Sequence, residues 1–534
     1  MKKKYFQILP MQFSQVKLIV WLAALFISTV SFSQTLFQKS YNNNGFERGT
    51  CVIKTNDGGY LEAGASGTGQ YGPDKFYIVK TDYTGGVTWS KIYAGDVSDY
   101  LACVIQTTDG GYMLVGTTFS FNTSPYGDIL VIKINATGAI SWQKHYGYTG
   151  YDYAESVQQT ADGGYIIGGL TSSFGAGYYD YFIMKIDSVG YGAWGTTIGG
   201  TGNDYAYAVL QTSDGGYMIG GQENSYSVTQ FNPYNIMLCK LNAAGNVLWS
   251  KAYGGGLSAG NYICNAIRNT TDGGIIVCGW TDGTGEGMQD VFMMKTDSAG
   301  ILQWSKTYGG ANSDFGYDVQ QTTNGGYAIA GTTKSFGAGN YDAYLITTDA
   351  TGNLVWSVCY GDTAVDMANS LEQTADGGFI IAGETSATGS SNSDFYLIKC
   401  DASGSTGCYE NDVLTIVTSP ATDEATILPI VTSNLLWSNA NAAVSSGCIA
   451  TTLCLTVGLE ETVNNAELFS LYPNPATDQI SFSEVLDGAE VFTVFGEVVV
   501  SMNGMIRDIS VSNLADGIYF IRSAGHVQRF VVQH

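Results

Sequence analysis

Carboxylate and tyrosine side chains are the groups in this sequence that could do chemistry. The chain has 47 Asp and Glu residues and 36 Tyr residues but only three His residues, of which only His145 precedes the C-terminal region. A Ser-His-Asp triad or a multi-histidine metal site therefore has almost no material. Arg48 and Arg268 are the only arginines between residues 34 and 408, which excludes a site that holds a carboxylate with three arginines.

Acidic residues recur at regular spacing and are the first candidate ligand-binding groups. One set is Asp99, Asp152, Asp204, Asp314 and Asp366, with Asn261 assigned to the equivalent place in one copy. Three interpretations stay open. Asp can cap loops by accepting backbone N–H groups, the loops could hold calcium as a hard cation, or a pair of carboxylates could hydrolyse a glycoside. Apart from calcium, no cofactor is expected.

Two non-repeated acids and a group of tyrosines add to these candidates. Glu155 and Glu372 would be the first suspects for a hydrolase that works near the mouth of a central channel. Tyrosines crowd the neighbourhood of the repeated acids, and they could stack on sugars and hydrogen-bond to them or simply pack loops. The tyrosines concerned are Tyr148, Tyr151, Tyr153, Tyr178, Tyr179, Tyr205 and Tyr207.

One unit, repeated seven times, must position all of these residues. The tetrad Asp-Gly-Gly-Tyr, or a close variant, begins at Asp57, Asp109, Asp162, Asp214, Asp272, Asn324 and Asp376. A strand-like segment such as residues 181–187 and, in most units, a Trp such as Trp89 recur in the same register. Each unit reads as four short strands with turns between them, and nothing in it shows helical periodicity.

Four-stranded units of this length predict an all-β fold, a seven-bladed β-propeller over residues 34–408, in preference to a right-handed β-helix. The last unit ends at Cys408 without a fourth strand, whereas residues 36–41 look like one. We therefore predict that this N-terminal strand completes the seventh blade, which leaves no open sheet edge. The connections that carry the repeated acids are expected to share one face of the ring.

These units resemble the bacterial seven-bladed propeller repeats that are rich in Asp-Gly-Gly-Tyr. The segment DATGNLVW, residues 349–356, also resembles the hairpin by which quinoprotein-type propeller blades dock on one another. The resemblance implies a structural role for this segment and no catalytic one.

The N-terminus has the layout of a secretory signal peptide over residues 1–33. Lysines precede an apolar run over residues 18–27, which is too short to span a bilayer. Small residues follow, so cleavage is expected between Ser33 and Gln34. No transmembrane segment is expected after signal removal.

The C-terminus carries a different pattern. Residues 409–465 read as a linker with some extra strands, and residues 466–534 as a small β-sandwich. The latter region resembles the type A C-terminal sorting domain of the type IX secretion system. The matching positions are Tyr472, Pro473, Asn474 and Pro475, then Leu514, Gly517, Ile518 and Tyr519, then Arg529, Phe530 and Val531. The resemblance implies the type IX machinery as a partner, and release or attachment at the outer cell surface.

Charge and cysteine content narrow the choice of partners. The formal net charge of −24 argues against nucleic acid as a ligand, because an acidic surface repels phosphate. Ten cysteines suit an oxidising compartment. A disulfide among Cys408, Cys448 and Cys454 would tie the linker to the ring, and the sequence leaves the pairing open. Together these features favour a secreted or surface-bound protein that binds a glycan or another protein without catalysis. A carbohydrate-active hydrolase and a structural surface protein are the alternatives.

Overall fold

The computed structural model describes most of the chain after residue 34. The described residues are 35–43, 45–67, 73–121, 125–226, 233–254, 260–386, 392–407, 410–413, 415–419, 423–426, 430–433, 437–439, 443–445, 449–457, 471–472, 476–493, 498–515, 517–523 and 526–532. The expected signal peptide with Ser33 and Gln34, and the sorting positions Pro473, Asn474 and Pro475, lie outside them. The fold is all-β, with no helix among the described residues.

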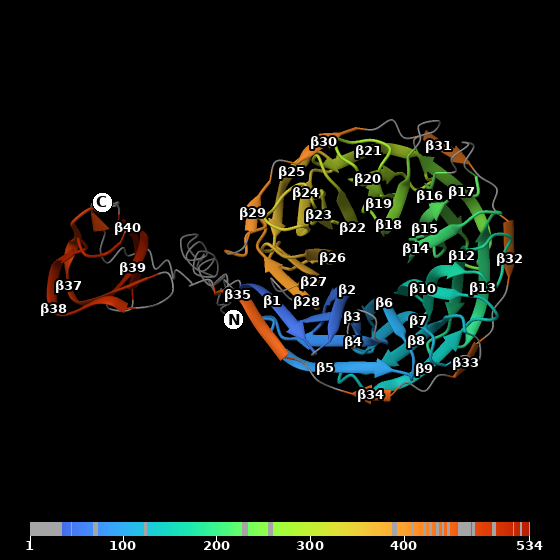
Figure 1. Ribbon diagram of the computed structural model, residues 1–534, viewed down its shortest axis with the longest axis horizontal. Coiled ribbons are helices and arrows are strands. Elements are labelled where there is room, and N and C mark those ends of the chain that lie inside the picture. Colours follow the sequence, from blue (N-terminus) through green and yellow to red (C-terminus); the bar gives the residue numbers. More distant parts are fainter. Residues whose placement is uncertain are drawn as a thin grey trace, which may run out of the picture. The chain divides into compact units, whose positions relative to one another are not determined.

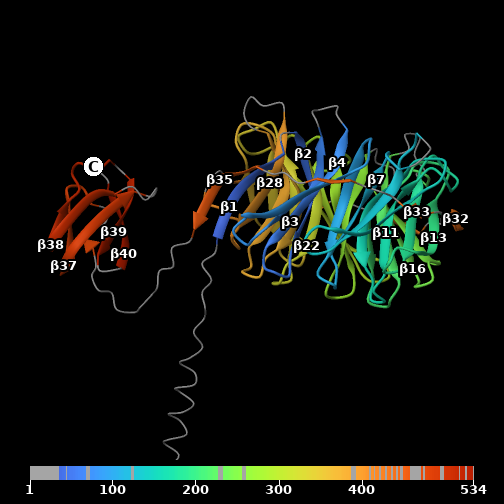
Figure 2. The ribbon, with the colours of Figure 1, turned by 90° about the horizontal axis from the view of Figure 1, so that it is seen from below.

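Two compact units make up the chain. The larger is Gln34–Val457, and the other contains the C-terminal strands. Within the described residues, the larger unit forms seven five-stranded antiparallel sheets, and Figure 1 shows them arranged around a common centre. This is a propeller-like repeat fold. Figure 2 shows the same sheets from the side, with loops at both ends of the strands.

Each sheet takes four strands in sequence from one repeat. Sheets 1 and 2 contain β2 (Phe46–Lys54), β3 (Tyr60–Gly67), β4 (Asp74–Thr81) and β5 (Val87–Ala94), then β6 (Asp99–Gln106), β7 (Tyr112–Thr118), β8 (Asp128–Ile134) and β9 (Ile140–Tyr146). Sheets 3 and 4 contain β10 (Asp152–Gln159), β11 (Tyr165–Thr171), β12 (Asp180–Ile186) and β13 (Gly192–Gly199), then β14 (Asp204–Gln211), β15 (Tyr217–Glu223), β16 (Asn235–Leu241) and β17 (Val247–Gly254).

The remaining repeats follow the same order until the last. Sheets 5 and 6 contain β18 (Tyr262–Asn269), β19 (Ile275–Thr281), β20 (Asp290–Thr296) and β21 (Leu302–Gly309), then β22 (Asp314–Gln321), β23 (Tyr327–Thr333), β24 (Asp342–Thr348) and β25 (Leu354–Tyr360). Sheet 7 contains β26 (Asp366–Gln373), β27 (Phe379–Ser386), β28 (Ser393–Cys400) and, from the N-terminus, β1 (Thr35–Asn42). In sheet 7, β1 pairs antiparallel with β28, and Phe37 lies opposite Lys399.

The Asp-Gly-Gly turn explains why each repeat folds back after its first strand. In the third repeat, Gly163 has a φ of 83°, which favours glycine because a side chain would clash there. Asp162 accepts the Gly164 N–H at 3.0 Å, and Lys185 of the third strand reaches the same carboxylate at 3.0 Å. The side chain of Lys185 is almost fully buried, so its charge needs this partner.

A belt of short strands, absent from the repeat pattern, forms the outer edge of every sheet. Its members are β29 (Glu410–Asp412), β30 (Ile416–Thr418), β31 (Asp423–Thr426), β32 (Ile430–Ser433), β33 (Trp437–Asn439), β34 (Ala443–Ser445) and β35 (Ile449–Val457). They pair in turn with sheets 6, 5, 4, 3, 2, 1 and 7, so this outer belt runs around the ring against the order of the repeats (Figure 1). Residues 409–465 were expected to be a linker, but strands from this region hydrogen-bond to all seven sheets.

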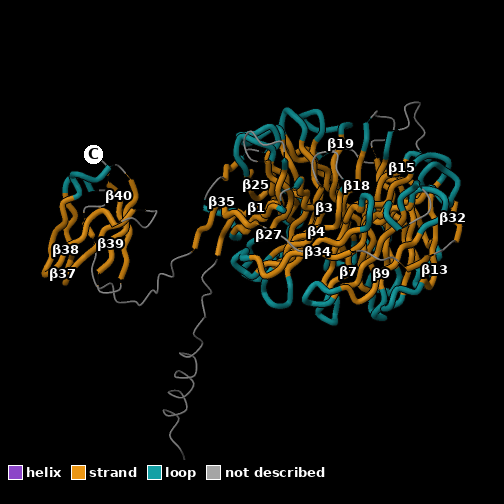
Figure 3. The backbone as a smooth tube through the Cα atoms, turned by 60° about the horizontal axis from the view of Figure 1, so that its bottom comes forward, coloured by secondary structure: helices purple, strands orange, loops and turns teal. Residues whose placement is uncertain are grey.

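The C-terminal unit is a small β-structure with its own core. It contains β36 (Leu471–Tyr472), β37 (Gln479–Thr493), β38 (Val498–Ser510), β39 (Gly517–Ser523) and β40 (His526–Val532). The pairing order is β36-β37-β39-β40, and β38 also pairs with β37. Ile480, Val491, Ile521 and Phe530 are fully buried in the core of this unit. Figure 3 shows strands and loops throughout the described chain. Among those residues, no helix is long and apolar enough to cross a membrane.

Candidate functional site

The repeated acids lie on one face of the ring, as expected from the connections that carry them. We call it the loop face. It is formed by the connections between second and third strands and by those between consecutive sheets. Parallel bridges join the two kinds of connection, at Tyr179 with Asn203 and at Gln289 with Ser313. Because these loops hydrogen-bond to one another, side chains from neighbouring sheets meet there.

The five candidate aspartates of this face are buried where their strands begin. Asp99, Asp152, Asp204, Asp314 and Asp366 are each at most 2% exposed. Asp314, for example, accepts hydrogen bonds from the Ser335 hydroxyl at 2.7 Å and the Gly310 N–H at 2.8 Å, and also from the Thr333 hydroxyl. Such contacts match the loop-capping interpretation, because the carboxylate oxygens are directed at the protein's own loops.

Several of these aspartates lie close to a second aspartate that belongs to the neighbouring sheet. Gly199 illustrates the arrangement: a Cβ at this glycine would lie 1.9 Å from Asp180 Oδ1 and 2.7 Å from Asp204 Oδ2. The same relation at Gly309 brings together Asp290 and Asp314. Burial, with the nearby Asp204 charge as a smaller cause, raises the pKa of Asp180 to about 6. Each pair thus places two carboxyl groups close together, and the charge of one disfavours ionisation of the other.

The register corrects one assignment in this set. The sequence pattern assigned Asn261 to the aspartate position of the fifth repeat. In the structure, Tyr262 lies opposite Thr281 at the start of β18, as Asp314 lies opposite Thr333 at the start of β22. The insertion in the preceding repeat hides this equivalence, because it shifts the spacing.

Calcium was one expected ligand of the repeated acids, and it needs several donor atoms close together. Among the described residues, no group of three or more His, Cys, Asp or Glu side chains is arranged to hold a metal ion. The carboxylate pairs supply two acidic groups each, and calcium takes six to eight oxygen ligands. The His145 side chain is largely buried, and its Nδ1 lies 3.1 Å from Asp128 Oδ2.

A row of tyrosine rings crosses sheets 2 to 4 on the loop face. The ring centroids of neighbouring members are 4.9 Å (Tyr126 and Tyr151), 6.4 Å (Tyr151 and Tyr179), 5.4 Å (Tyr179 and Tyr205) and 6.0 Å (Tyr205 and Tyr234) apart. Tyr153 stacks on Tyr151 at 5.8 Å with an interplanar angle of 7°. We call these six residues the tyrosine row.

The structure therefore brings together four of the seven tyrosines singled out from the sequence, namely Tyr151, Tyr153, Tyr179 and Tyr205. Tyr178 is 79% exposed, and the ring contacts of the row pass through its neighbour Tyr179 instead. Sequence reasoning missed Tyr126 and Tyr234. Tyr234 stands directly before the third strand of its repeat, as Tyr179 does, and this equivalence is a signal that could have found it. Burial, and then the neighbouring phenols, raise the pKa of Tyr153 to about 12, so its hydroxyl stays protonated in neutral solution.

Non-repeated side chains meet on the strands nearest the centre of the ring. We call β2, β6, β10, β14, β18, β22 and β26 the inner strands; each lies at the edge of its sheet farthest from the outer belt (Figure 1). All seven have a bulge or register shift at the same place, such as between Gly316 and Asp318. Four of the residues that follow a bulge, Cys51, Ser156, Asp318 and Ser370, make a hydrogen bond to the next inner strand.

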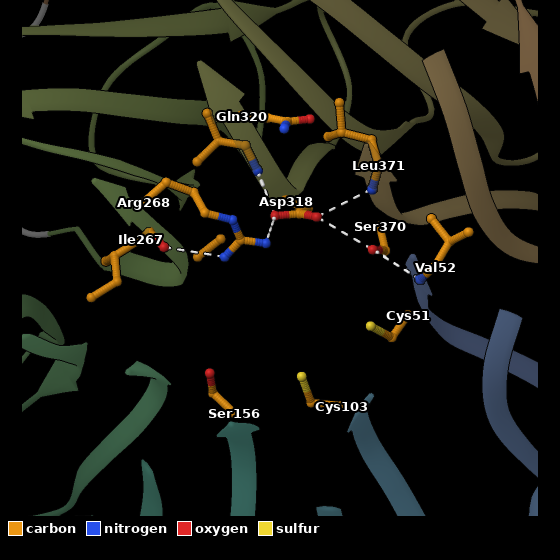
Figure 4. A network of polar contacts seen from close by, with 12 residues as sticks. Cys51, Val52, Cys103, Ser156, Ile267, Arg268, Asp318, Gln320, Ser370 and Leu371 are labelled. Carbon is orange, nitrogen blue, oxygen red and sulfur yellow. Dashed lines mark hydrogen bonds and ion pairs between the residues drawn. The ribbon is translucent and has the colours of Figure 1, made fainter. Parts of the chain in front are cut away.

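Asp318 is the best connected of these residues (Figure 4). It accepts hydrogen bonds from Arg268 Nη2 at 2.7 Å, from the Leu371 N–H at 3.1 Å and from the Ser370 hydroxyl at 3.3 Å. Ser370 in turn accepts the Val52 N–H at 3.2 Å, which extends the network from sheet 5 to sheet 1. Asp318 is buried, so these contacts neutralise and satisfy it, and its role is to join inner strands.

Glu155 and Glu372, the two suspected acids, stand on the inner strands of sheets 3 and 7, which are not neighbours. Glu372 accepts the Lys54 N–H at 3.2 Å and is thereby part of the contact between sheets 7 and 1. Burial, with a smaller effect of Cys103, raises the pKa of Glu155 to about 7. The Glu155 carboxyl can therefore change its protonation state near neutral pH.

The sorting positions that the structure describes lie in the core of the C-terminal unit or beside it. Tyr472 is in β36, and Gly517 begins β39. The Tyr519 ring lies 5.9 Å from that of Phe530, and its hydroxyl donates to the Ala515 carbonyl at 3.0 Å. Tyr519 therefore fixes the turn before β39 against the core.

Comparisons with solved structures find only distant likeness for the larger part of the chain. A protein of unknown function from Dyadobacter fermentans matches with 11% identity and a TM-score of 0.41, over 68% of this chain and 97% of that chain. Sqt1 from Chaetomium thermophilum, bound to the N-terminus of ribosomal protein L10, matches with 10% identity and a TM-score of 0.39, over 70% and 100%. None of the curated proteins matches the chain.

PorZ, a surface component of the type IX secretion system of Porphyromonas gingivalis, matches with 9% identity and a TM-score of 0.17, over 92% of this chain and 100% of that chain. Scores of this size indicate neither a shared family nor a shared function. The C-terminal region is different, because residues 470–533 match the family described as the secretion system C-terminal sorting domain. This chain therefore carries a type IX secretion system sorting domain at residues 470–533, and the protein is exported and either attached to the outer cell surface or secreted.

Proposed function

We propose that the exported unit is a closed seven-bladed β-propeller that binds a glycan through the tyrosine row, without catalysis. The seven sheets, and the pairing of β1 with β28, support the blade count and the closure. The outer belt supports a rigid scaffold, because each sheet has its outer edge paired.

The tyrosine row is the observation that carries the glycan assignment. Its rings are half-buried or exposed, and they follow one another across three sheets instead of packing into separate cores. Aromatic faces stack on the apolar faces of sugar rings, and phenol hydroxyls exchange hydrogen bonds with sugar hydroxyls. A row of this kind fits an extended oligosaccharide better than a monosaccharide, because several rings in line offer several stacking positions.

A glycan array probed with the secreted protein tests this assignment. We expect binding to extended oligosaccharides, and we expect Tyr151→Ala and Tyr179→Ala each to weaken it at least tenfold. Tyr83→Ala is the matched control, because Tyr83 is 63% exposed in a turn outside the row. The proposal is wrong if no glycan binds, or if the two row variants bind as well as the control. Capture of a surface protein by the row would point to a protein ligand instead.

A hydrolase is the second candidate, and Glu155 is the observation that favours it. Both Tyr153 and Tyr207 have their pKa values raised in part by the Glu155 charge, so this carboxyl lies close to the row. A carboxyl with a pKa of about 7 could act as a general acid. Release of reducing sugar by the wild type, and its loss in Glu155→Gln with binding retained, would support this candidate. Binding without release would leave the non-catalytic assignment in place.

A further inference from the structure

The inner strands of sheets 1 and 2 bring two cysteines together. Cys51 and Cys103 follow the bulge at equivalent places of β2 and β6. Both thiols lie near one carbonyl oxygen, with Cys51 Sγ 3.6 Å and Cys103 Sγ 3.9 Å from Val104 O. Each thiol also shifts the pKa of the other. Figure 4 shows the two side chains on neighbouring inner strands.

Repeat symmetry gives a second reason to regard the two side chains as neighbours. Asp318 and Ser370 occupy the same place on two other adjacent inner strands, and their side-chain oxygens are 3.3 Å apart. The register that brings this pair into contact is the one that faces Cys51 with Cys103. Five other cysteines whose burial the structure describes, Cys239, Cys264, Cys278, Cys359 and Cys400, are fully or almost fully buried, whereas Cys51 and Cys103 are partly exposed.

The pKa values of the two thiols are shifted in opposite directions, and this difference favours a reaction between them. The Cys51 hydrogen bond lowers the pKa of Cys103, and the Val157 backbone and the Arg268 charge act in the same direction. Its hydrogen bond to Cys103 and its burial raise the pKa of Cys51 well above its usual value. A thiolate is the nucleophile in disulfide exchange, so Cys103 is the attacking group of the pair.

We propose that Cys51 and Cys103 are an oxidation site and form a disulfide that joins the inner strands of sheets 1 and 2 in the exported protein. The sorting domain directs the chain out of the reducing cytoplasm, into compartments where disulfides persist. The bond closes a loop that contains one whole repeat.

The oxidant is a disulfide compound, R–S–S–R, such as a dithiol oxidase of the cell envelope. The Cys103 thiolate attacks one sulfur of that compound, and the first R–S⁻ leaves and takes up the proton that Cys103 has lost. Cys51 then loses its proton and attacks Cys103 Sγ, which expels the second R–S⁻, and this takes up the second proton. Two protein thiols are oxidised to one disulfide, and the donor is reduced to two thiols.

Peptide mapping of the full chain, recovered from the medium or the cell surface, tests the proposal. The protein is denatured with iodoacetamide and without reductant, digested and examined by mass spectrometry. We expect a cross-linked peptide that contains Cys51 and Cys103 and is lighter by two hydrogens than the sum of its parts. Cys278, fully buried, is the control and is expected to be alkylated. Recovery of both Cys51 and Cys103 as alkylated thiols, also after incubation of the native protein with oxidised glutathione, would overturn the proposal.

The melting temperature provides a second test of the proposed disulfide, so that the proposal can still be judged if one variant folds poorly. Dithiothreitol should lower the melting temperature of the wild type by more than that of the double variant Cys51→Ser, Cys103→Ser. Cys278→Ser is the matched control and should keep the response to reductant. An equal response of the wild type and the double variant would show that no bond between these two residues stabilises the ring.

Discussion

The Tyr41 hydroxyl donates a hydrogen bond to the Gly85 carbonyl oxygen at 2.8 Å, which links the N-terminal strand of sheet 7 to a turn of sheet 1. The same contact joins consecutive sheets elsewhere, at 2.6 to 2.7 Å. It is made by Tyr93 with Gly138, Tyr146 with Gly190, Tyr253 with Gly300, Tyr308 with Gly352 and Tyr360 with Gly404. Between sheets 3 and 4, Thr196 bonds to Gly245 at 3.4 Å instead. The junction at the chain's N-terminus thus repeats the bond that holds the other sheets together.

Replacing Tyr41 with Phe should therefore destabilise the ring as much as the same change at an internal junction. The Gly85 carbonyl would lose a buried donor, and we expect about 1 kcal/mol less free energy of unfolding. Denaturant unfolding of Tyr41→Phe and Tyr308→Phe checks this. If only Tyr308→Phe were less stable, the contact of β1 with sheet 1 would contribute nothing to the fold.

Removing the outer belt should cause association between molecules. A chain that ends at residue 407 exposes the outer edges of β5, β9, β13, β17, β21, β25 and β1, all of which pair with belt strands. Unpaired edge strands bind one another, so we expect oligomers or precipitate. Size-exclusion chromatography with light scattering checks this. A chain that ends at residue 457 keeps the belt and should stay monodisperse, and the prediction fails if both chains behave alike.

Deleting residues 470–533 should keep the protein inside the cell envelope. The sorting domain directs export, so its loss removes the signal and leaves the ring folded, because the two units have separate cores. Fractionation and immunoblotting of the producing cells would locate the protein. Tyr519→Ala should reduce export by disturbing the contact with Phe530, whereas Met505→Ala, at an 80% exposed residue, should not. Normal export of the deleted chain would contradict the assignment.

The melting temperature should fall as pH rises from about 4 to about 6. Burial raises the pKa of Asp152 from 3.8 to about 6, and the same holds for Asp180, Asp290 and Asp366. The folded chain then binds protons more tightly than the unfolded chain in this range. This stabilisation is fully present below pH 3.8 and is lost as pH rises through about 6.

Two substitutions distinguish the effect of the buried aspartates on the melting temperature from other effects of pH. Asp152→Asn removes one titrating group and should make the change of melting temperature between pH 4 and pH 6 smaller. Asp162→Asn is the control. Hydrogen bonds from Thr160 and Gly164 and the Lys185 charge outweigh burial and lower the pKa of Asp162 to about 2, so it stays charged throughout that range. A melting temperature that rises over the range would show that the buried aspartates are ionised without cost.

Some features of the fold and of the candidate site could be predicted from the sequence, and others could not. The Asp-Gly-Gly turns and the shared face of the acid-bearing connections were predicted because a repeated turn needs the same residues each time. The belt strands were missed as partners of the sheets. They are mostly three or four residues long and have no period, and their pairing depends on edges that other segments provide. The position of Tyr262 was missed because only the register reveals it.

The sequence by itself determined the repeating strands and turns and the presence of a sorting domain, since both depend on residues close together in the chain. Only the tertiary structure decided which side chains meet between repeats. Cys51 reaches Cys103, and Tyr151 reaches Tyr179, because neighbouring sheets pack with a fixed register. That register comes from contacts between residues far apart in sequence, and the repeat pattern alone does not show which side chains these contacts bring together.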